Sequence, residues 1–150
     1  TFIDCWRGVV VREDSSGGVT SGTDSLRVTR STFEDCFGPG ILIQNGSGHR
    51  ITFSDFSNCG QSASSPVAAA AIHIDGGGTG FSVQFNTLDK DSNTLAIGGT
   101  SISASDFTRF TQNSMLGYTG VSGATDSGFD STNPDAVALQ ALADTYNVTD

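Results

Sequence analysis

Residues 28–43 read VTRSTFEDCFGPGILI, and this stretch decides the fold. Its large apolar residues are spaced by five and then by three positions: Val28, Phe33 and Cys36. We find the same two intervals at three further places: Ile51, Phe56 and Cys59; Val83, Leu88 and Asp91; Ile102, Phe107 and Phe110. The chain also opens inside this pattern, with Phe2 and Cys5. Fixed spacing within a unit and variable length between units is typical of a solenoid built coil by coil.

A second element with a period of two lies between these units: Val9–Val11, Ile41–Ile43, Ile72–Ile74 and Leu95–Ile97. The period of two predicts strands whose outer residues share one face. The interval of three between Phe33 and Cys36 does not fit a strand and indicates a tight bend. Asp35 precedes Cys36, and Asp4 and Asn58 hold the equivalent places. Such residues favour bends because their short side chains bond to nearby backbone.

Stacked coils lie about 4.8 Å apart, so equivalent residues form columns. We predict one inward column of large side chains: Phe2, Phe33, Phe56, Leu88 and Phe107. A second inward column holds the three cysteines: Cys5, Cys36 and Cys59. An inward thiol acts as a small apolar group, which predicts free, buried cysteines. The chain has no CxxC or Cys/His spacing that would indicate a zinc site, and we expect neither a metal nor a cofactor.

This arrangement resembles the right-handed parallel β-helix of the pectate-lyase-like superfamily. The resemblance is carried by FEDC at 33–36, FSNC at 56–59 and GILI at 40–43, and it covers roughly residues 1–110. It implies an all-β solenoid of four to five coils. Members of the superfamily include polysaccharide lyases, glycoside hydrolases, uronan epimerases, autotransporter adhesins and phage tailspikes. The resemblance therefore implies a fold without implying one chemistry.

We divide the chain into a parallel β-helix over 1–111, a linker or cap over 112–132, and a C-terminal helix over 133–150. Because Thr1 falls inside a coil, we expect the β-helix to be truncated at its N-terminus. Asn133, Pro134 and Asp135 supply an N-cap, a proline at the first helical position and an acid in the first turn.

A helix this short is marginal alone, so it needs a partner. That partner is either the end of the β-helix or the same helix in other subunits. A β-helix followed by a linker and a helix is similar to phage tail fibres and tailspikes, which are trimers.

The charge balance excludes two classes of partner. The chain has 16 acidic and 7 basic residues, for a net charge of −9. Nucleic acid and anionic membrane surfaces both require clustered cations, so neither is an expected partner. Insertion into a membrane is also not expected, because no apolar run approaches the ~20 residues of a membrane span.

Two pairs of residues are candidates for catalysis. Asp4 and Asp35 lie one coil apart, and retaining glycosidases use carboxyl groups about 5 Å apart. A ladder of bend residues that continues to Asn58 explains the same pair. His73 and Asp75 lie two apart on a strand and could act as an oriented base, or they form a surface pair beside a glycine turn. The sequence offers no convergent acid, base and charge stabiliser, so enzyme activity stays open; an active chain would be a polysaccharide depolymerase.

Sugar binding has three candidate residues. Arg27 and Arg50 share one column and could hold an anionic sugar, or they only neutralise nearby Asp. Trp6 stacks on Phe37 as a sugar platform, an interface anchor or a core-lining pair, the last of which we favour. Two columns of uncharged polar residues form either a solvated face or a sugar-binding face: Thr29, Thr52, Gln84 and Ser103; Ser31, Ser54, Asn86 and Ser105.

The middle residues of the second element should face outward, yet Val10, Leu42 and Ala96 are apolar. This stripe indicates a subunit interface, or it is covered by a loop. With Leu139 and Leu142 on the terminal helix, it leads us to expect a homotrimer.

The expected function is the structural and receptor-binding part of a phage tailspike or tail fibre. It would contact host surface polysaccharide and lie outside the cell or on the virion surface. The alternatives are the C-terminal part of a β-helical polysaccharide lyase, hydrolase or epimerase, and a bacterial surface adhesin.

Overall fold

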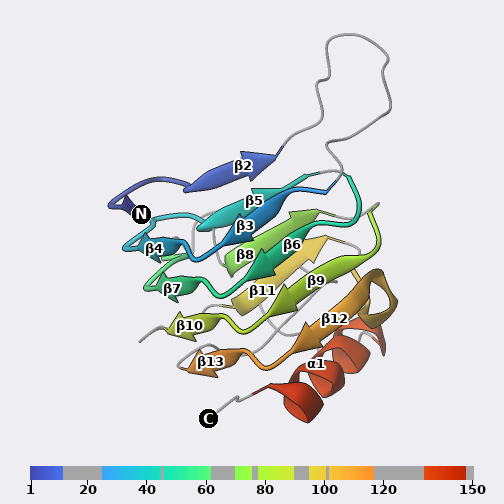
Figure 1. The fold of residues 1–150 in the computed structure, drawn as a ribbon. Helices are drawn as coiled ribbons and strands as arrows, with labels where there is room; N and C mark the ends of the chain where they lie inside the picture. Colours follow the sequence, from blue (N-terminus) through green and yellow to red (C-terminus); the bar gives the residue numbers. More distant parts are fainter. Residues whose placement is uncertain are drawn as a thin grey trace, which may run out of the picture.

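The computed structural model describes residues 1–11, 25–44, 46–61, 70–75, 78–89, 95–100, 102–116 and 134–147. This part of the chain is mostly β-structure in parallel sheets, with one short α-helix (Figure 1). The predicted all-β class is therefore confirmed at this level.

Strands form three parallel sheets. The first sheet contains β1 (Phe2–Ile3), β4 (Thr32–Glu34), β7 (Asp55–Ser57), β10 (Thr87–Asp89) and β13 (Ser114–Leu116). The second contains β2 (Val9–Val11), β5 (Ile41–Ile43), β8 (Ala70–Asp75) and β11 (Leu95–Thr100). The third contains β3 (Arg27–Thr29), β6 (Arg50–Thr52), β9 (Phe81–Gln84) and β12 (Phe107–Thr111). Along the chain, successive strands enter the three sheets in strict rotation, which is compatible with a β-helix-like fold.

The register between strands follows the predicted spacing in the first four units. Phe2 pairs with Phe33, Phe33 with Phe56, and Phe56 with Leu88. The rings of Phe33 and Phe56 are stacked, with centroids 4.7 Å apart and an angle of 6° between their planes. In the third sheet, the inward column is Val28, Ile51, Val83 and Phe110.

The prediction for the last unit is wrong. Leu88 pairs with Met115, whereas Phe107 pairs with Phe81 in the third sheet. The five-residue interval occurs twice here, from Ile102 to Phe107 and from Phe110 to Met115. Only the second copy spans a bend between two strands, because η2 (Ala104–Asp106) lies inside the first. The parallel pattern consequently continues to Leu116, beyond the predicted end at residue 111.

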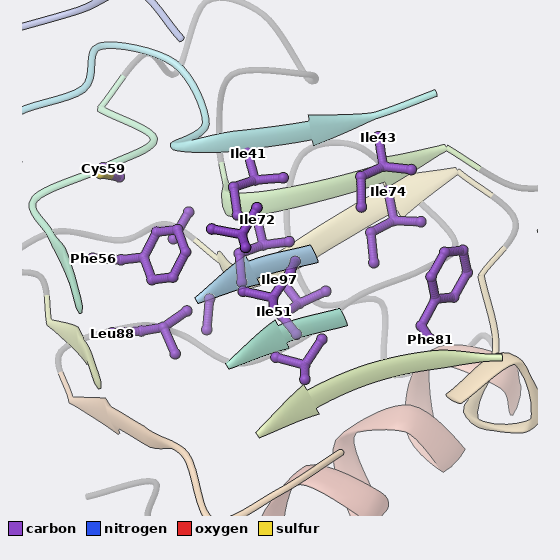
Figure 2. Close-up of a cluster of buried hydrophobic side chains, with 14 of the residues drawn as sticks. Ile41, Ile43, Ile51, Phe56, Cys59, Ile72, Ile74, Phe81, Leu88 and Ile97 are labelled. Atoms are coloured by element: carbon purple, nitrogen blue, oxygen red, sulfur yellow. The ribbon is translucent and has the colours of Figure 1, made fainter. Parts of the chain in front are cut away.

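Apolar side chains from the three sheets meet in a narrow interior (Figure 2). Phe56, Leu88 and Cys59 approach from one side of this interior, and Phe81 from the other (Figure 2). Cys36 and Cys59 are buried and Cys5 is partly buried, and all three thiols are free. The sulfur atoms of Cys5 and Cys36 lie 3.0 Å apart, as expected of an inward column.

Left-handed backbone forms the corners between sheets. Asp4, Asp35 and Asn58 each have φ of 51°, which confirms the predicted bend ladder, and such short polar residues tolerate this conformation. The corner between the third and first sheets repeats it with bulkier residues: Arg30, Phe53, Phe85 and Gln112, with φ between 50° and 59°. Bulky side chains at positive φ persist only where stacked neighbours fix the backbone.

A buried ladder of polar side chains runs beside that corner, where a solvated or sugar-binding face was the expectation. Asn86 Oδ1 accepts a bond of 3.0 Å from the Ser54 N–H, and Asn113 Oδ1 accepts one of 3.0 Å from the Asn86 N–H. Asn113, rather than Ser105, therefore continues the column. These side chains satisfy backbone groups that would otherwise be buried without partners.

Helix α1 (Pro134–Tyr146) lies against the C-terminal end of the sheets, next to β12 (Figure 1). Leu142 is half-buried and packs against the core cluster. Asn147, directly after the helix, accepts bonds from the backbone N–H and side-chain amide of Asn113, at 3.0 and 2.7 Å. The helix thus finds a partner within its own chain, and Asn147 provides the last rung of the polar ladder.

Candidate ligand-binding groove

The outer face of the third sheet carries two columns of side chains. Strand alternation turns the residues on either side of the inward column (Val28, Ile51, Val83 and Phe110) to the outer face. One column is Arg27, Arg50, Ser82 and Arg109, and the other is Thr29, Thr52, Gln84 and Thr111. The four strands lie side by side along the molecule (Figure 1).

A groove follows these columns. One part has a volume of about 410 Å³ and is lined by Arg27, Arg50, Ser82, Gln84 and Arg109, together with neighbouring Ser, Gly and Thr residues. A part of about 290 Å³ extends it over Thr29 and Thr52. We call the surface of Arg27, Arg50, Arg109, Ser82 and Gln84 the arginine groove.

The arginine groove is cationic in an acidic protein. It contains three of the chain's 7 basic residues, whereas the whole chain has a net charge of −9. Among the described residues that line it, none is Asp or Glu. The possibility that Arg27 and Arg50 only neutralise nearby Asp therefore has no support in the lining of the groove.

Neutral polar groups fill the space beside the arginines and are ordered by mutual bonds. The Gln84 side-chain amide donates to Thr111 Oγ1 at 3.1 Å, and the Ser82 hydroxyl donates to Gln84 Oε1 at 3.2 Å. Thr52 Oγ1 donates to Thr29 Oγ1 at 3.4 Å. This row offers hydroxyl and amide groups, which can both donate and accept hydrogen bonds.

An exposed aromatic pair borders the polar row. Phe53 follows Thr52 and Phe85 follows Gln84, and 55% and 41% of their surfaces are exposed. Their rings are stacked, with centroids 4.8 Å apart and an angle of 1° between planes. The sequence prediction did not include this pair. Its one sequence signal is position, because both residues follow the polar column directly.

Trp6 lies elsewhere, between β1 and β2, and does not line the groove. It contacts Phe37, with ring centroids 4.7 Å apart, and the two side chains are 55% and 43% exposed. The favoured prediction of a core-lining pair is wrong, since neither ring is buried. A sugar platform and an interface anchor remain as interpretations of this pair.

The candidate catalytic residues are also outside the groove. Asp4 and Asp35 are exposed bend residues, and the Asn58 side-chain amide donates to Asp35 Oδ1 at 2.7 Å. His73 is buried in β8, and the side chain of Asp75 lies outside the described residues. The described lining of the groove contains no Asp, Glu, His or Cys to act as a general acid or base.

The predicted interface stripe is only partly open. Val10 is 42% exposed, whereas Leu42 has no exposed surface within the single chain, so cover from within the chain accounts for it. Ala96 is wrongly placed in this stripe, because Gly98 rather than Ala96 pairs with His73. Ala96 belongs instead to the buried core cluster. Leu142 packs on the core of its own chain, and the side chain of Leu139 lies outside the described residues.

The thiols of Cys5 and Cys36 are unreactive. Burial, followed by a hydrogen bond with Cys36, raises the pKa of the Cys5 thiol to about 11. A hydrogen bond with Cys59 and burial raise the pKa of the Cys36 thiol. Both groups are therefore protonated at neutral pH and are poor nucleophiles.

Comparison of the chain with protein-family models, with curated proteins and with solved structures finds no match. In the part of the chain that the structure describes, no group of three His, Cys, Asp or Glu side chains is placed to hold a metal ion. No helix among these residues has the length and hydropathy needed to cross a membrane.

Proposed function

We propose that the chain is a segment of a right-handed parallel β-helix of the pectate-lyase-like type, and that it binds polysaccharide as part of a phage tailspike or tail fibre. The rotation of strands through three parallel sheets supports the solenoid. The near-universal right hand of parallel crossover connections supports its handedness. The function rests on one observation: a cationic and polar groove, without carboxylates in its described lining, beside an exposed aromatic pair.

A polysaccharide fits this surface better than a compact ligand does. Gln84, Ser82 and Thr52 offer ordered amide and hydroxyl groups, which match sugar hydroxyls. Phe53 and Phe85 add an apolar edge, and the apolar faces of sugar rings pack against such groups. The groove runs across stacked strands, so a linear chain could contact several of them in succession.

The assembled protein, on this proposal, is a homotrimer on the virion surface or outside the cell, and its partner is a host surface polysaccharide. Exposed apolar residues away from the groove support self-association, among them Val10 and Trp6. Closed rotational symmetry would keep such an assembly finite.

There are two alternatives to this function. One is an enzyme, namely a polysaccharide lyase, hydrolase or epimerase, and the other is a bacterial surface adhesin. Binding is favoured over cleavage because the described lining of the groove lacks acid–base residues. If the chain cleaves its ligand, the candidate residues lie outside the groove, Asp35 and His73 among them.

The test is direct binding of the chain to a panel of neutral and acidic bacterial surface polysaccharides, with reducing-end and unsaturated-uronate assays on the same mixtures. We expect binding without cleavage, and weaker binding after Gln84→Ala. The matched control is Gln61→Ala, since Gln61 is exposed but lies outside the groove. Failure to bind any member of the panel would refute the proposal. Cleavage that is abolished by Asp35→Asn in a folded chain would favour the enzyme.

A further inference from the structure

We propose that the ligand of the arginine groove is an anionic glycan whose sugars carry carboxylates, laid across the strands of the third sheet with those carboxylates on Arg27, Arg50 and Arg109. This inference rests on the proposed polysaccharide binding and adds the charge class of the ligand and the residues that recognise it. Arg109 was not among the residues predicted from sequence. It enters the site because Phe110, rather than Ile102, continues the column of Val83.

The placement of charge is the first argument. A net charge of −9 repels an anionic polymer in general, but that repulsion is screened over a Debye length of about 8 Å at physiological ionic strength. At contact distance, the local groups decide the sign of the interaction. The described lining of the arginine groove has three guanidinium groups and no carboxylate. This face is therefore suited to an anion although the protein as a whole is acidic.

The pairing of Arg27 with Arg50 is the second argument. They are register partners on adjacent strands, which places them about 4.8 Å apart along the sheet. Like charges directly opposite each other on neighbouring strands destabilise a sheet. A carboxylate between or above them removes that repulsion, and each guanidinium can bind it through two parallel hydrogen bonds.

The order of the column gives the ligand a pattern. Ser82 separates Arg50 from Arg109, so the column reads cation, cation, hydroxyl, cation. The distance between neighbouring strands is comparable to the length of one pyranose unit in an extended chain. Consecutive sugars can therefore face consecutive strands, with acidic sugars over the arginines and a hydroxyl-bearing sugar over Ser82.

The remaining rows favour a sugar over other anions. Gln84 and the threonines beside it offer hydrogen bonds to ring hydroxyls, and Phe53 with Phe85 offers apolar contact. A nucleic acid would require more than three clustered cations. A second copy of the chain is the main competitor, because the first sheet exposes Glu34, Asp55 and Asp89.

The experiment compares two ligands that differ only in charge: an oligoglucuronate and the same oligomer with its carboxyl groups reduced to alcohols. Binding to the chain is measured by calorimetry at low and high salt. We expect the reduced oligomer to bind more weakly by on the order of tenfold or more, as lost charge-assisted bonds imply. We also expect high salt to weaken the binding of the acidic oligomer and to leave the binding of the reduced oligomer unchanged.

Variants locate the site. Arg27→Gln with Arg50→Gln should weaken oligoglucuronate binding by on the order of tenfold or more, and Arg109→Gln should weaken binding of the longer oligomers. The control is Arg7→Gln, which removes one charge between β1 and β2, outside the described lining of the groove. It should bind like the parent chain. If the double variant does not fold, the comparison of the two oligomers with the parent chain still decides.

Equal affinity for both oligomers, unchanged in the arginine variants, would overturn this inference and leave polysaccharide binding standing. No binding to either oligomer or to any of the polysaccharides would overturn both. Equally strong binding of a single-stranded oligonucleotide would overturn the assignment to glycans. A fall in molar mass of the double variant, measured by light scattering, would identify the groove as a contact between copies and would also overturn it.

Discussion

Phe56 lies in the middle of the aromatic column, between Phe33 and Leu88, and is 1% exposed. Replacing it with alanine removes buried apolar contacts and leaves a cavity that the hydrogen-bonded sheets cannot easily close. We expect Phe56→Ala to lower the free energy of unfolding by roughly 3–5 kcal/mol. The measurement is equilibrium unfolding in urea.

Phe53→Ala is the matched control, since Phe53 is an exposed phenylalanine three residues away. It loses only a surface stack with Phe85. Such an aromatic pair contributes about 0.5–1.5 kcal/mol to the free energy of unfolding. If the two variants unfold at the same urea concentration, the aromatic column is not the core of the fold.

The thiol column predicts an alkaline loss of stability. The pKa of Cys5 is raised from an ordinary value of 9.0 to about 11 in the folded chain, so the unfolded chain releases this proton first as the pH rises. Between those two values the unfolded state holds fewer protons than the native state, and stability therefore falls with rising pH. Below pH 9 this contribution does not change with pH.

Unfolding in urea at several pH values checks this prediction, with Cys5→Ala as the reference. The alanine variant should lose less stability than the parent over the same alkaline range. Identical pH profiles for both proteins would contradict the raised pKa. Titration of the denatured chain without reductant should also find three free thiols, as the structure has them.

The polar ladder is an element of the fold that a hydrophobic pattern cannot supply. Asn86 accepts from the Ser54 N–H at 3.0 Å and donates to the Ile51 carbonyl at 3.0 Å, and both bonds are buried. Asn86→Ala leaves those backbone groups without their side-chain partner, which should cost about 2–5 kcal/mol in the free energy of unfolding. Thr87→Ala, on the exposed side of the next strand, should change it by less than about 0.5 kcal/mol. Equal effects of the two changes would show that the ladder contributes little.

The contacts of helix α1 lead us to expect that stability differs between the two ends of the sheets. Leu142 packs against the core, and Asn147 closes the polar ladder over Asn113. Because each strand pairs only with its neighbours in its sheet, weakening one end of the sheets should loosen that end first. We expect Asn147→Ala to speed amide hydrogen exchange in β12 and β13, while β4 and β7 keep the exchange rates of the parent chain. Uniformly faster exchange along the stack would mean that the helix does not act as an end cap.

Much of the sheet structure was predictable because the intervals of five and three reflect real geometry. Phe33, Phe56 and Leu88 occupy equivalent inward positions before a corner, and the register follows from them. The last strands of the sheets were not predictable in this way. Two separate copies of the five-residue interval occur there, and only the three-dimensional position of η2 distinguishes them. The same error hid Arg109, which precedes Phe110 as Arg50 precedes Ile51.

Exposure was harder to predict than register. Phe53 and Phe85 are large apolar residues outside the core, because left-handed corners turn them toward solvent. Leu42 shows the opposite case, since it alternates out of the interior and is nevertheless covered. Period-two patterning gives the direction of a side chain, but it does not state what covers it.

The whole molecule distributes charge and apolar surface unevenly over its sides. The third sheet presents arginines, and the first sheet presents Glu34, Asp55 and Asp89. Away from the groove and its aromatic pair, exposed apolar side chains gather around β1 and β2, where Ile3, Trp6 and Val10 are 54%, 55% and 42% exposed. The surface best suited to self-association is therefore separate from the groove.

That separation leads to a prediction about assembly. If the proposed trimer forms, it should bury the surface around Trp6 and Val10, because removing such apolar area from water favours association by about 25 cal/mol per Å². Trp6→Ser with Val10→Ser should then lower the molar mass measured by light scattering, whereas Phe53→Ser at the groove edge should leave it unchanged. Binding to the acidic oligomer should follow the reverse order, with Phe53→Ser the more harmful change. A parent chain that is monomeric at every concentration would reject the trimer but leave the groove intact, since every side chain assigned to the groove belongs to one chain.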